Sequence, residues 1–195
     1  MLMLKDKRYS DLYKRYLKEA LKFDGKDKKI LKADCSNEYY GYPFFQQEPS
    51  HHPNPYLVPW GIAPLMEAEV SLIDINPEIV AKVKDFTEGM LNVIEGDIRE
   101  MPYQDESFDV VMDLSTLDHV PFGDTKKALG EYRRVLKKDG DLLLISWTDG
   151  DRQHADAFYH SYDRLDKEIR ELFKIVRTEV MLKDDGGELC LWATK

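Results

Sequence analysis

Short apolar runs and amphipathic stretches alternate along most of the chain. Apolar runs of strand length occupy residues 30–33, 70–74, 91–95, 108–114, 141–147, 173–182 and 188–194. Apolar positions recur at helical spacing over residues 9–23, from residue 77 to residue 86, and over 124–137 and 162–172. Strands that alternate with helices indicate a parallel sheet covered by helices on both faces. The pattern therefore predicts an α/β fold, a Rossmann-like, doubly wound and mostly parallel sheet.

Glycine and proline positions sharpen the boundaries of these elements. Pro77 stands where the second helix should begin, and Gly140 follows the helix predicted over 124–137. Asp185, Gly186 and Gly187 separate the last two strand-like runs, which is typical of a hairpin turn. This hairpin predicts a C-terminal antiparallel strand next to the parallel ones.

The length of 195 residues fits a single domain, predicted here over residues 1–195. Residues 1–27 are expected to contain an N-terminal helix. Residues 35–60 break the α/β pattern because they are rich in proline and aromatic side chains, which exclude a regular helix or a central strand. A loop of this length in a compact domain is usually functional or disordered, and its aromatic content favours an ordered role such as a lid.

Charge is distributed unevenly over the chain. The net charge is −9, although residues 1–32 alone carry 11 Lys and Arg against 5 Asp and Glu. The acidic remainder argues against a broad nucleic-acid surface, so no nucleic-acid partner is expected. No apolar run is long enough to span a bilayer and the N-terminal segment is too polar for a signal peptide, which together predict a cytoplasmic protein without a membrane partner. Cys35 and Cys190 lack the spacing of a zinc site, and no metal is expected.

Three segments in a fixed order carry a family resemblance. Residues 94–111 read IEGDIREMPYQDESFDVV, residues 113–121 read DLSTLDHVP, and residues 132–144 read YRRVLKKDGDLLL. These segments resemble the "lPf…sFD.V", histidine-containing and "RvLkpGG.l.i" motifs of class I S-adenosylmethionine-dependent methyltransferases, with the small-molecule enzymes called type 11 the most similar group. The resemblance implies S-adenosyl-L-methionine as cofactor, a small-molecule substrate as methyl acceptor, and a methyltransferase activity.

The resemblance also implies roles for individual residues at the ends of the strands. Asp74, with Ile75 beside it, should accept hydrogen bonds from the ribose hydroxyls, a role that suits a carboxylate because it has only acceptor atoms. Asp97 should accept from the adenine amino group, with Ile98 against the ring. The methionine part of the cofactor and the transfer site should lie along a third strand end. The residues implied there are Asp113, Leu114 and Ser115.

His119 matches a frequent histidine of the same pattern. It could orient a substrate or act as a base, and a purely structural role at a strand-to-helix turn is equally consistent with the sequence. No residue is therefore assigned as catalytic.

The family's glycine-rich first loop is replaced in this chain. Residues 30–38 read ILKADCSNE, so that Cys35 matches the family pattern whereas Asp34, Ser36 and Glu38 stand where glycines belong. By position, Asp34, Cys35 and Ser36 are the cofactor-binding residues expected in this loop. Glycine allows a sharp turn and a close approach of the backbone to the ligand, and both are restricted by a Cβ atom.

Two explanations of the altered loop remain open. The loop could be rebuilt with residues from the 35–60 insertion and keep its cofactor, which gives a working methyltransferase. Alternatively the site is inactive, and the fold serves as a binding or assembly module. A nucleic-acid-modifying enzyme that uses the basic N-terminal helix is a third possibility. The sequence leaves the methyl acceptor and the oligomeric state open.

Overall fold

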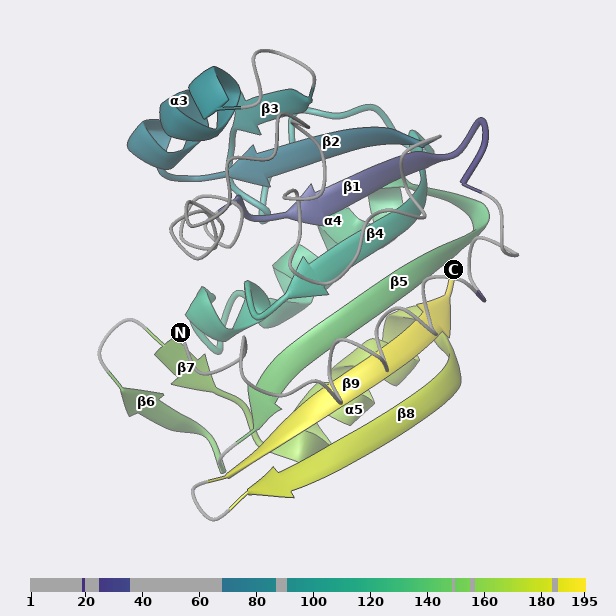
Figure 1. Cartoon of the computed structure of the whole chain (residues 1–195). Helices are drawn as coiled ribbons and strands as arrows, with labels where there is room; N and C mark the ends of the chain where they lie inside the picture. The colour runs from purple at the N-terminus through teal and green to yellow at the C-terminus, as the bar shows by residue number, and fades with distance from the viewer. Residues whose placement is uncertain are drawn as a thin grey trace, which may run out of the picture.

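The computed structural model of the protein describes residues 19, 25–35, 68–86, 91–148, 150–154, 157–183 and 186–195. Seven strands of this part form one sheet in the order β3-β2-β1-β4-β5-β9-β8, which Figure 1 shows face-on. These strands are β1 Lys29–Ala33, β2 Glu69–Asp74, β3 Asn92–Glu95, β4 Phe108–Leu114, β5 Leu136–Thr148, β8 Lys174–Lys183 and β9 Gly186–Thr194. Two short strands, β6 Arg152–His154 and β7 Ala157–Tyr159, pair with each other in a separate small sheet.

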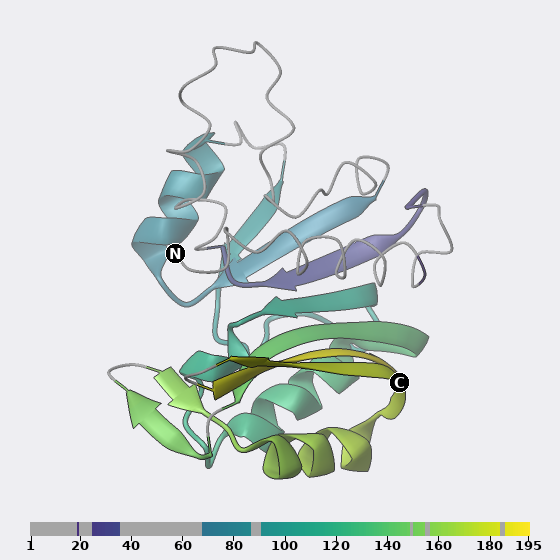
Figure 2. The ribbon, with the colours of Figure 1, turned by 60° about the horizontal axis from the view of Figure 1, so that its bottom comes forward.

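Helices cover both faces of the main sheet. Figure 2 shows α4 Thr125–Val135 and α5 Tyr162–Leu172 together beneath it, while α3 Pro77–Phe86 lies near β2 and β3. The alternation of side chains along β2 explains this division, since Leu72 packs with α3 in one apolar cluster and its neighbour Ile73 belongs to the larger cluster that includes α4 and α5.

The strand directions confirm the predicted fold class. Strands β1 to β5 pair in parallel, whereas β9 runs antiparallel to both of its neighbours, β5 and β8. The hairpin predicted from the glycines near residue 186 is therefore present, and β9 is the one antiparallel strand of this sheet within the described residues. Helix α3 begins at Pro77 as predicted, and the side-chain oxygen of Asn76 caps it by accepting from the backbone N–H of Glu78 at 2.9 Å.

Two features of the C-terminal half differ from the sequence prediction. The helix expected over 124–137 ends at Val135, and β5 begins at Leu136 instead of at residue 141. Leu136 pairs with Phe108 ahead of a register shift, so the strand starts before Gly140. Strands β6 and β7 were not predicted, because three residues are too few for a periodic pattern to be recognised.

The predicted N-terminal helix and the 35–60 insertion lie outside the described residues, except for Glu19, which is helical, and Cys35. Both therefore stay predictions, as does the single-domain boundary. Among the described helices, none combines the length and the apolar character that crossing a bilayer requires.

Candidate functional site

A cavity of about 560 Å³ opens at the carboxyl ends of the first four parallel strands. Strand β1 lies between β2 and β4, so the order of the sheet changes direction there, and open α/β sheets bind ligands at such a point. The lining residues all follow or end these strands or belong to the turn after β4. They are Asp34, Ile73, Asp74, Ile75, Gly96, Asp97, Ile98, Arg99, Leu114, Ser115, Thr116, His119, Val120 and Pro121.

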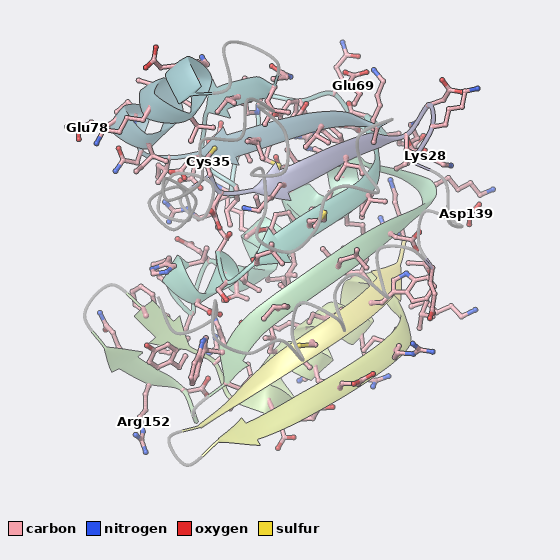
Figure 3. All side chains as sticks on the ribbon, viewed as in Figure 1. Lys28, Cys35, Glu69, Glu78, Asp139 and Arg152 are labelled. Atoms are coloured by element: carbon pink, nitrogen blue, oxygen red, sulfur yellow. The ribbon has the colours of Figure 1, made fainter. Side chains whose placement is uncertain are left out.

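Most of the site residues expected from the sequence line this one cavity. Asp34, Asp74, Ile75, Asp97, Ile98, Leu114 and Ser115 are among its walls. Cys35 and Asp113 are fully buried beside it without lining it, and Ser36 lies outside the described residues. Figure 3 labels Cys35 at this end of β1 and Glu69 at the opposite end of the neighbouring strand.

Asp74 joins two neighbouring strand ends. Its carboxylate is almost fully buried, with Oδ2 accepting from the backbone N–H of Cys35 at 2.9 Å and Oδ1 accepting from the backbone N–H of Asn76 at 2.8 Å. Asp74 thus holds both loops, and a carboxylate, which has only acceptor atoms, suits the hydroxyl groups of a ligand.

The Asp97 carboxylate accepts hydrogen bonds from the guanidinium group of Arg99, which belongs to the same loop. Arg99 donates from Nε to both oxygens of Asp97 at 3.0 Å, and from Nη2 to Oδ2 at 2.6 Å. The same guanidinium reaches Asp124 Oδ2 at 2.7 Å and thereby ties this loop to the segment before α4. The hydrogen bond from Arg99 lowers the pKa of Asp97 below its usual value. An adenine amino group would have to share these oxygens with Arg99, a residue that the sequence analysis did not identify.

Asp113 has a different place from the one expected. Side chains alternate along β4, so its carboxylate faces α4, where it accepts from the Tyr132 hydroxyl at 2.6 Å and from the backbone N–H groups of Thr116 and Leu117. Burial raises its pKa to about 6, even though these hydrogen bonds act in the opposite direction. Asp113 thus positions the turn after β4 from behind the cavity.

Two residues at the base of the cavity have a backbone conformation that favours glycine. Asp34 has φ of 87° and Ser115 has φ of 66°, both in the left-handed region. Such residues cost of the order of 1–3 kcal/mol each and cluster at functional sites. Asp34 therefore adopts a glycine-like conformation at a position where the sequence analysis expected a glycine. At Gly96, a Cβ would lie 2.9 Å from Cδ1 of Ile73, so the end of that side chain would have to shift to admit another residue.

His119 lies on the cavity wall at the end of the 3-10 helix η4 Leu117–His119. Thr116, the residue before η4, shares its single hydroxyl proton between the carbonyl oxygen of Ala33 at 2.6 Å and Oδ2 of Asp34 at 2.8 Å, and so links the ends of β1 and β4. Thr116 gave no sequence signal, because a threonine after a strand is common in any turn.

Comparisons with known proteins agree with the family resemblance noted in the sequence. A family model described as a methyltransferase domain matches residues 60–144. The methyltransferase YcgJ of Bacillus subtilis is 32% identical over 97 residues, which are 48% of this chain and 38% of that protein. The ubiquinone/menaquinone biosynthesis C-methyltransferase UbiE of Rhizobium etli is 30% identical over 101 residues, 49% of this chain and 38% of that protein. The matched part thus spans little more than a third of these relatives.

Solved structures share the fold at low sequence identity. The N-methyltransferase NodS of Bradyrhizobium japonicum, solved with S-adenosyl-L-homocysteine, has a TM-score of 0.68 at 13% identity and covers 98% of this chain and 89% of its own. The 4+2 cyclase SpnF has a TM-score of 0.68 at 17% identity, covering 96% of this chain and 80% of its own. These likenesses establish the fold, and the second shows that the fold is shared by a protein named for another reaction.

Proposed function

We propose that the chain binds S-adenosyl-L-methionine in this cavity and transfers its methyl group to a small molecule. The premise is the match of residues 60–144 to a methyltransferase-domain model, together with a fold like that of a solved methyltransferase. The observation that carries the proposal is the joint placement of Asp74 and Asp97. Both carboxylates lie at neighbouring strand ends on one cavity whose volume suits a nucleoside.

The chemistry of the walls fits the proposed ligand. Asp74 offers acceptor oxygens for ribose hydroxyls beside Ile75, which is 64% exposed and presents apolar surface at the cavity. Ile98 provides a second apolar wall for the adenine ring. Asp97 would accept from the adenine amino group by sharing its oxygens with Arg99.

The bound cofactor would supply an electrophilic methyl group on its sulfonium sulfur. The contribution of the chain would be to hold and align the two reactants, because alignment alone can account for much of such a rate enhancement. Leu114, Ser115 and Thr116 line the cavity on the side of β4, where the methionine part and the acceptor would meet. His119 would face the acceptor from the same side.

A small-molecule acceptor is favoured over a nucleic acid by the charge of the chain. The net charge is −9, and the cavity wall itself carries three carboxylates against one arginine. A polyanion would be repelled by this surface. One of the relatives named above, UbiE, is named for ubiquinone and menaquinone biosynthesis, which agrees with the proposal.

Calorimetry with S-adenosyl-L-methionine and S-adenosyl-L-homocysteine tests the cofactor proposal. We expect micromolar binding by the wild-type protein and at least about a tenfold loss in Asp74→Asn, because an amide replaces one acceptor by a donor. Glu69→Gln, at the other end of the same strand, is the matched control and should bind like the wild type. Circular dichroism would confirm that Asp74→Asn is folded. The absence of binding by the wild type at millimolar ligand would contradict the proposal.

Transfer is tested separately from binding. A donor labelled in its methyl group would be incubated with the protein and, in parallel, with the small-molecule fraction of a cell extract, with RNA and with DNA. Label in the small-molecule fraction alone is the expected result. Tight cofactor binding with no transfer to any fraction would favour the alternative function, a binding module that keeps the methyltransferase fold.

A further inference from the structure

The side chain of Asp34 occupies the wall of the cavity at the junction of β1 and β4. It follows the last residue of β1, and its backbone N–H donates to the carbonyl of Ile73 at 2.7 Å, which fixes the loop against β2. Its side chain is 14% exposed and lines the cavity. A glycine would adopt the φ of 87° at lower cost, so the backbone alone does not account for an aspartate here.

Two polar groups hold the Asp34 carboxylate in place. Thr116 donates its hydroxyl to Oδ2 at 2.8 Å, and the ammonium of Lys32 lies 3.5 Å from Oδ1. Lys32 is fully buried, and it also donates to the backbone carbonyl of Asp34 at 3.0 Å. The buried ammonium of Lys32 thus helps to hold the Asp34 carboxylate, whose exposed part lines the cavity.

The electrostatic environment of this junction is negative. Asp34 and Asp74 line the cavity, and Asp113 lies buried behind it at the end of β4. The charge of Asp34 is one of the causes that raise the pKa of Asp113, although burial is the larger one. Lys32 offsets one of these charges, and the net field at the junction favours a positively charged ligand group.

From this arrangement we infer that Asp34 is a specificity-determining residue of the cavity, whose carboxylate recognises a positive charge on the ligand. The inference rests on the proposed function and deepens it, because the cofactor carries two cationic groups, the sulfonium and the α-ammonium of its methionine part. The altered first loop then gains a charge-recognising side chain in place of the close backbone approach that glycine would allow.

Three ligands distinguish the two cationic groups. S-adenosyl-L-methionine has both, S-adenosyl-L-homocysteine has only the ammonium, and 5′-deoxy-5′-methylthioadenosine has neither. We expect Asp34→Asn to weaken the binding of at least one charged ligand by about tenfold and to leave the neutral nucleoside unchanged. A loss confined to the sulfonium compound assigns the contact to the sulfur, and an equal loss for the two charged ligands assigns it to the ammonium.

Variants at Lys32 separate charge recognition from loop stability. Asparagine tolerates the left-handed backbone conformation of residue 34. Asp34→Asn, however, leaves the buried Lys32 without the negative charge of Asp34. The double variant Lys32→Met/Asp34→Asn removes both charges and so keeps the site balanced. It should show the same ligand discrimination as Asp34→Asn. Lys32→Met alone removes the competing cation and should tighten the binding of the charged ligands several-fold, an effect that a purely structural aspartate would not produce.

These binding measurements can contradict the role of Asp34 without contradicting the binding of the cofactor. If the wild type binds all three ligands and the Asp34 variants weaken them equally or leave them all unchanged, the inference is overturned while the proposed function stands. If the wild type binds none of them, both fail.

Discussion

Tyr132 on α4 donates its hydroxyl to Oδ2 of Asp113 on β4 at 2.6 Å, and both side chains are fully buried. The bond joins the helix layer to the strand that ends at the cavity. We expect Tyr132→Phe to lower the free energy of unfolding by about 1–3 kcal/mol, because it leaves a buried carboxylate with one donor fewer. Urea denaturation would measure this.

Tyr103 provides the matched control for that substitution. Its hydroxyl is also buried, yet it has no hydrogen-bond partner among the described residues. Tyr103→Phe should therefore change the free energy of unfolding by less than about 0.5 kcal/mol or increase it. Equal losses for the two variants would show that the Tyr132–Asp113 bond contributes nothing specific.

We expect His160 to make the stability of the protein sensitive to acid. The ring is fully buried and packs edge-on against Phe122, with a centroid distance of 5.0 Å. Burial lowers its pKa to about 4 from 6.5. The unfolded chain therefore binds this proton at a higher pH than the folded protein does, and stability falls as the pH drops from about 6.5 to about 4. His160→Phe should remove roughly 1–3 kcal/mol of this loss, measured by urea denaturation across that range.

Asp113 contributes to the pH dependence with the opposite sign. Its pKa is raised to about 6, so the folded protein takes up this proton before the unfolded chain does, and the contribution to stability grows as the pH falls from about 6 to 3.8. We expect the His160→Phe variant to lose less stability than the wild type on acidification, or to gain some. Identical pH profiles for the variant and the wild type would contradict the assignment of the acid sensitivity to His160.

Gly140 lies where a side chain would be crowded by backbone atoms. A Cβ there would lie 3.0 Å from the backbone oxygen of Lys137 and 3.1 Å from that of Asp109, and backbone atoms at this register shift between β4 and β5 can yield less easily than the end of a side chain. Gly140→Ala should lower the melting temperature, with a cost of about 1–3 kcal/mol. A Cβ at Gly130 in α4 would meet no atom within 4 Å, so Gly130→Ala should raise stability by about 0.5–1 kcal/mol. A stabilised Gly140→Ala variant would contradict this reasoning.

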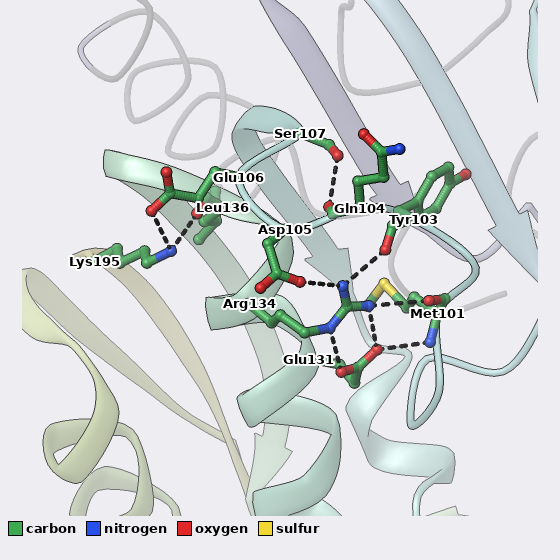
Figure 4. A network of polar contacts seen from close by, with 10 residues as sticks. All are labelled: Met101, Tyr103, Gln104, Asp105, Glu106, Ser107, Glu131, Arg134, Leu136 and Lys195. Atoms are coloured by element: carbon green, nitrogen blue, oxygen red, sulfur yellow. Dashed lines mark hydrogen bonds and ion pairs between the residues drawn. The ribbon is translucent and has the colours of Figure 1, made fainter.

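Arg134 connects α4 to the loop between β3 and β4 (Figure 4). Its guanidinium donates to both oxygens of Glu131 at 2.7 Å, to Asp105, and to the backbone carbonyls of Met101 and Tyr103. A lysine keeps the charge but cannot supply this planar set of donors, so Arg134→Lys should destabilise the protein by about 1–3 kcal/mol.

Arg133, the preceding residue, is the control for that variant. It makes one exposed hydrogen bond, to the carbonyl of Leu172. Arg133→Lys should change the free energy of unfolding in urea by less than about 0.5 kcal/mol. A similar loss for the two substitutions would indicate a general preference for arginine on this helix.

The regular elements and the position of the cavity could be predicted from the sequence because both depend on local patterns. Apolar runs separated by amphipathic stretches identified the strands and helices, and the aspartates at 74 and 97 followed two of those strands. Parallel strands bring their carboxyl ends to one edge, so these residues had to lie near one another.

The orientation of single side chains could not be predicted in the same way. Strand β4 is buried on both faces, so its apolar run gave no sign that Asp113 faces α4 while Leu114 faces the cavity. The contact of Arg99 with Asp97 and Asp124 depends on how two loops fold against each other, and no periodic pattern records that. The β6–β7 pair was not predicted because each strand has only three residues.

Strand β9 is synthesised after β5 and β8, yet it lies between them and pairs with both. During translation β5 can already pair with β4, but its other edge, and strand β8, have no partner in the sheet until residues 186–194 have left the ribosome. Until then, β5 presents an unpaired edge, which is a site for wrong association with other nascent chains. Because β8 and β9 form one hairpin, the open edge of β5 is covered only when that hairpin joins the sheet, and chaperone dependence should be greatest for ribosome-bound chains that end before residue 186.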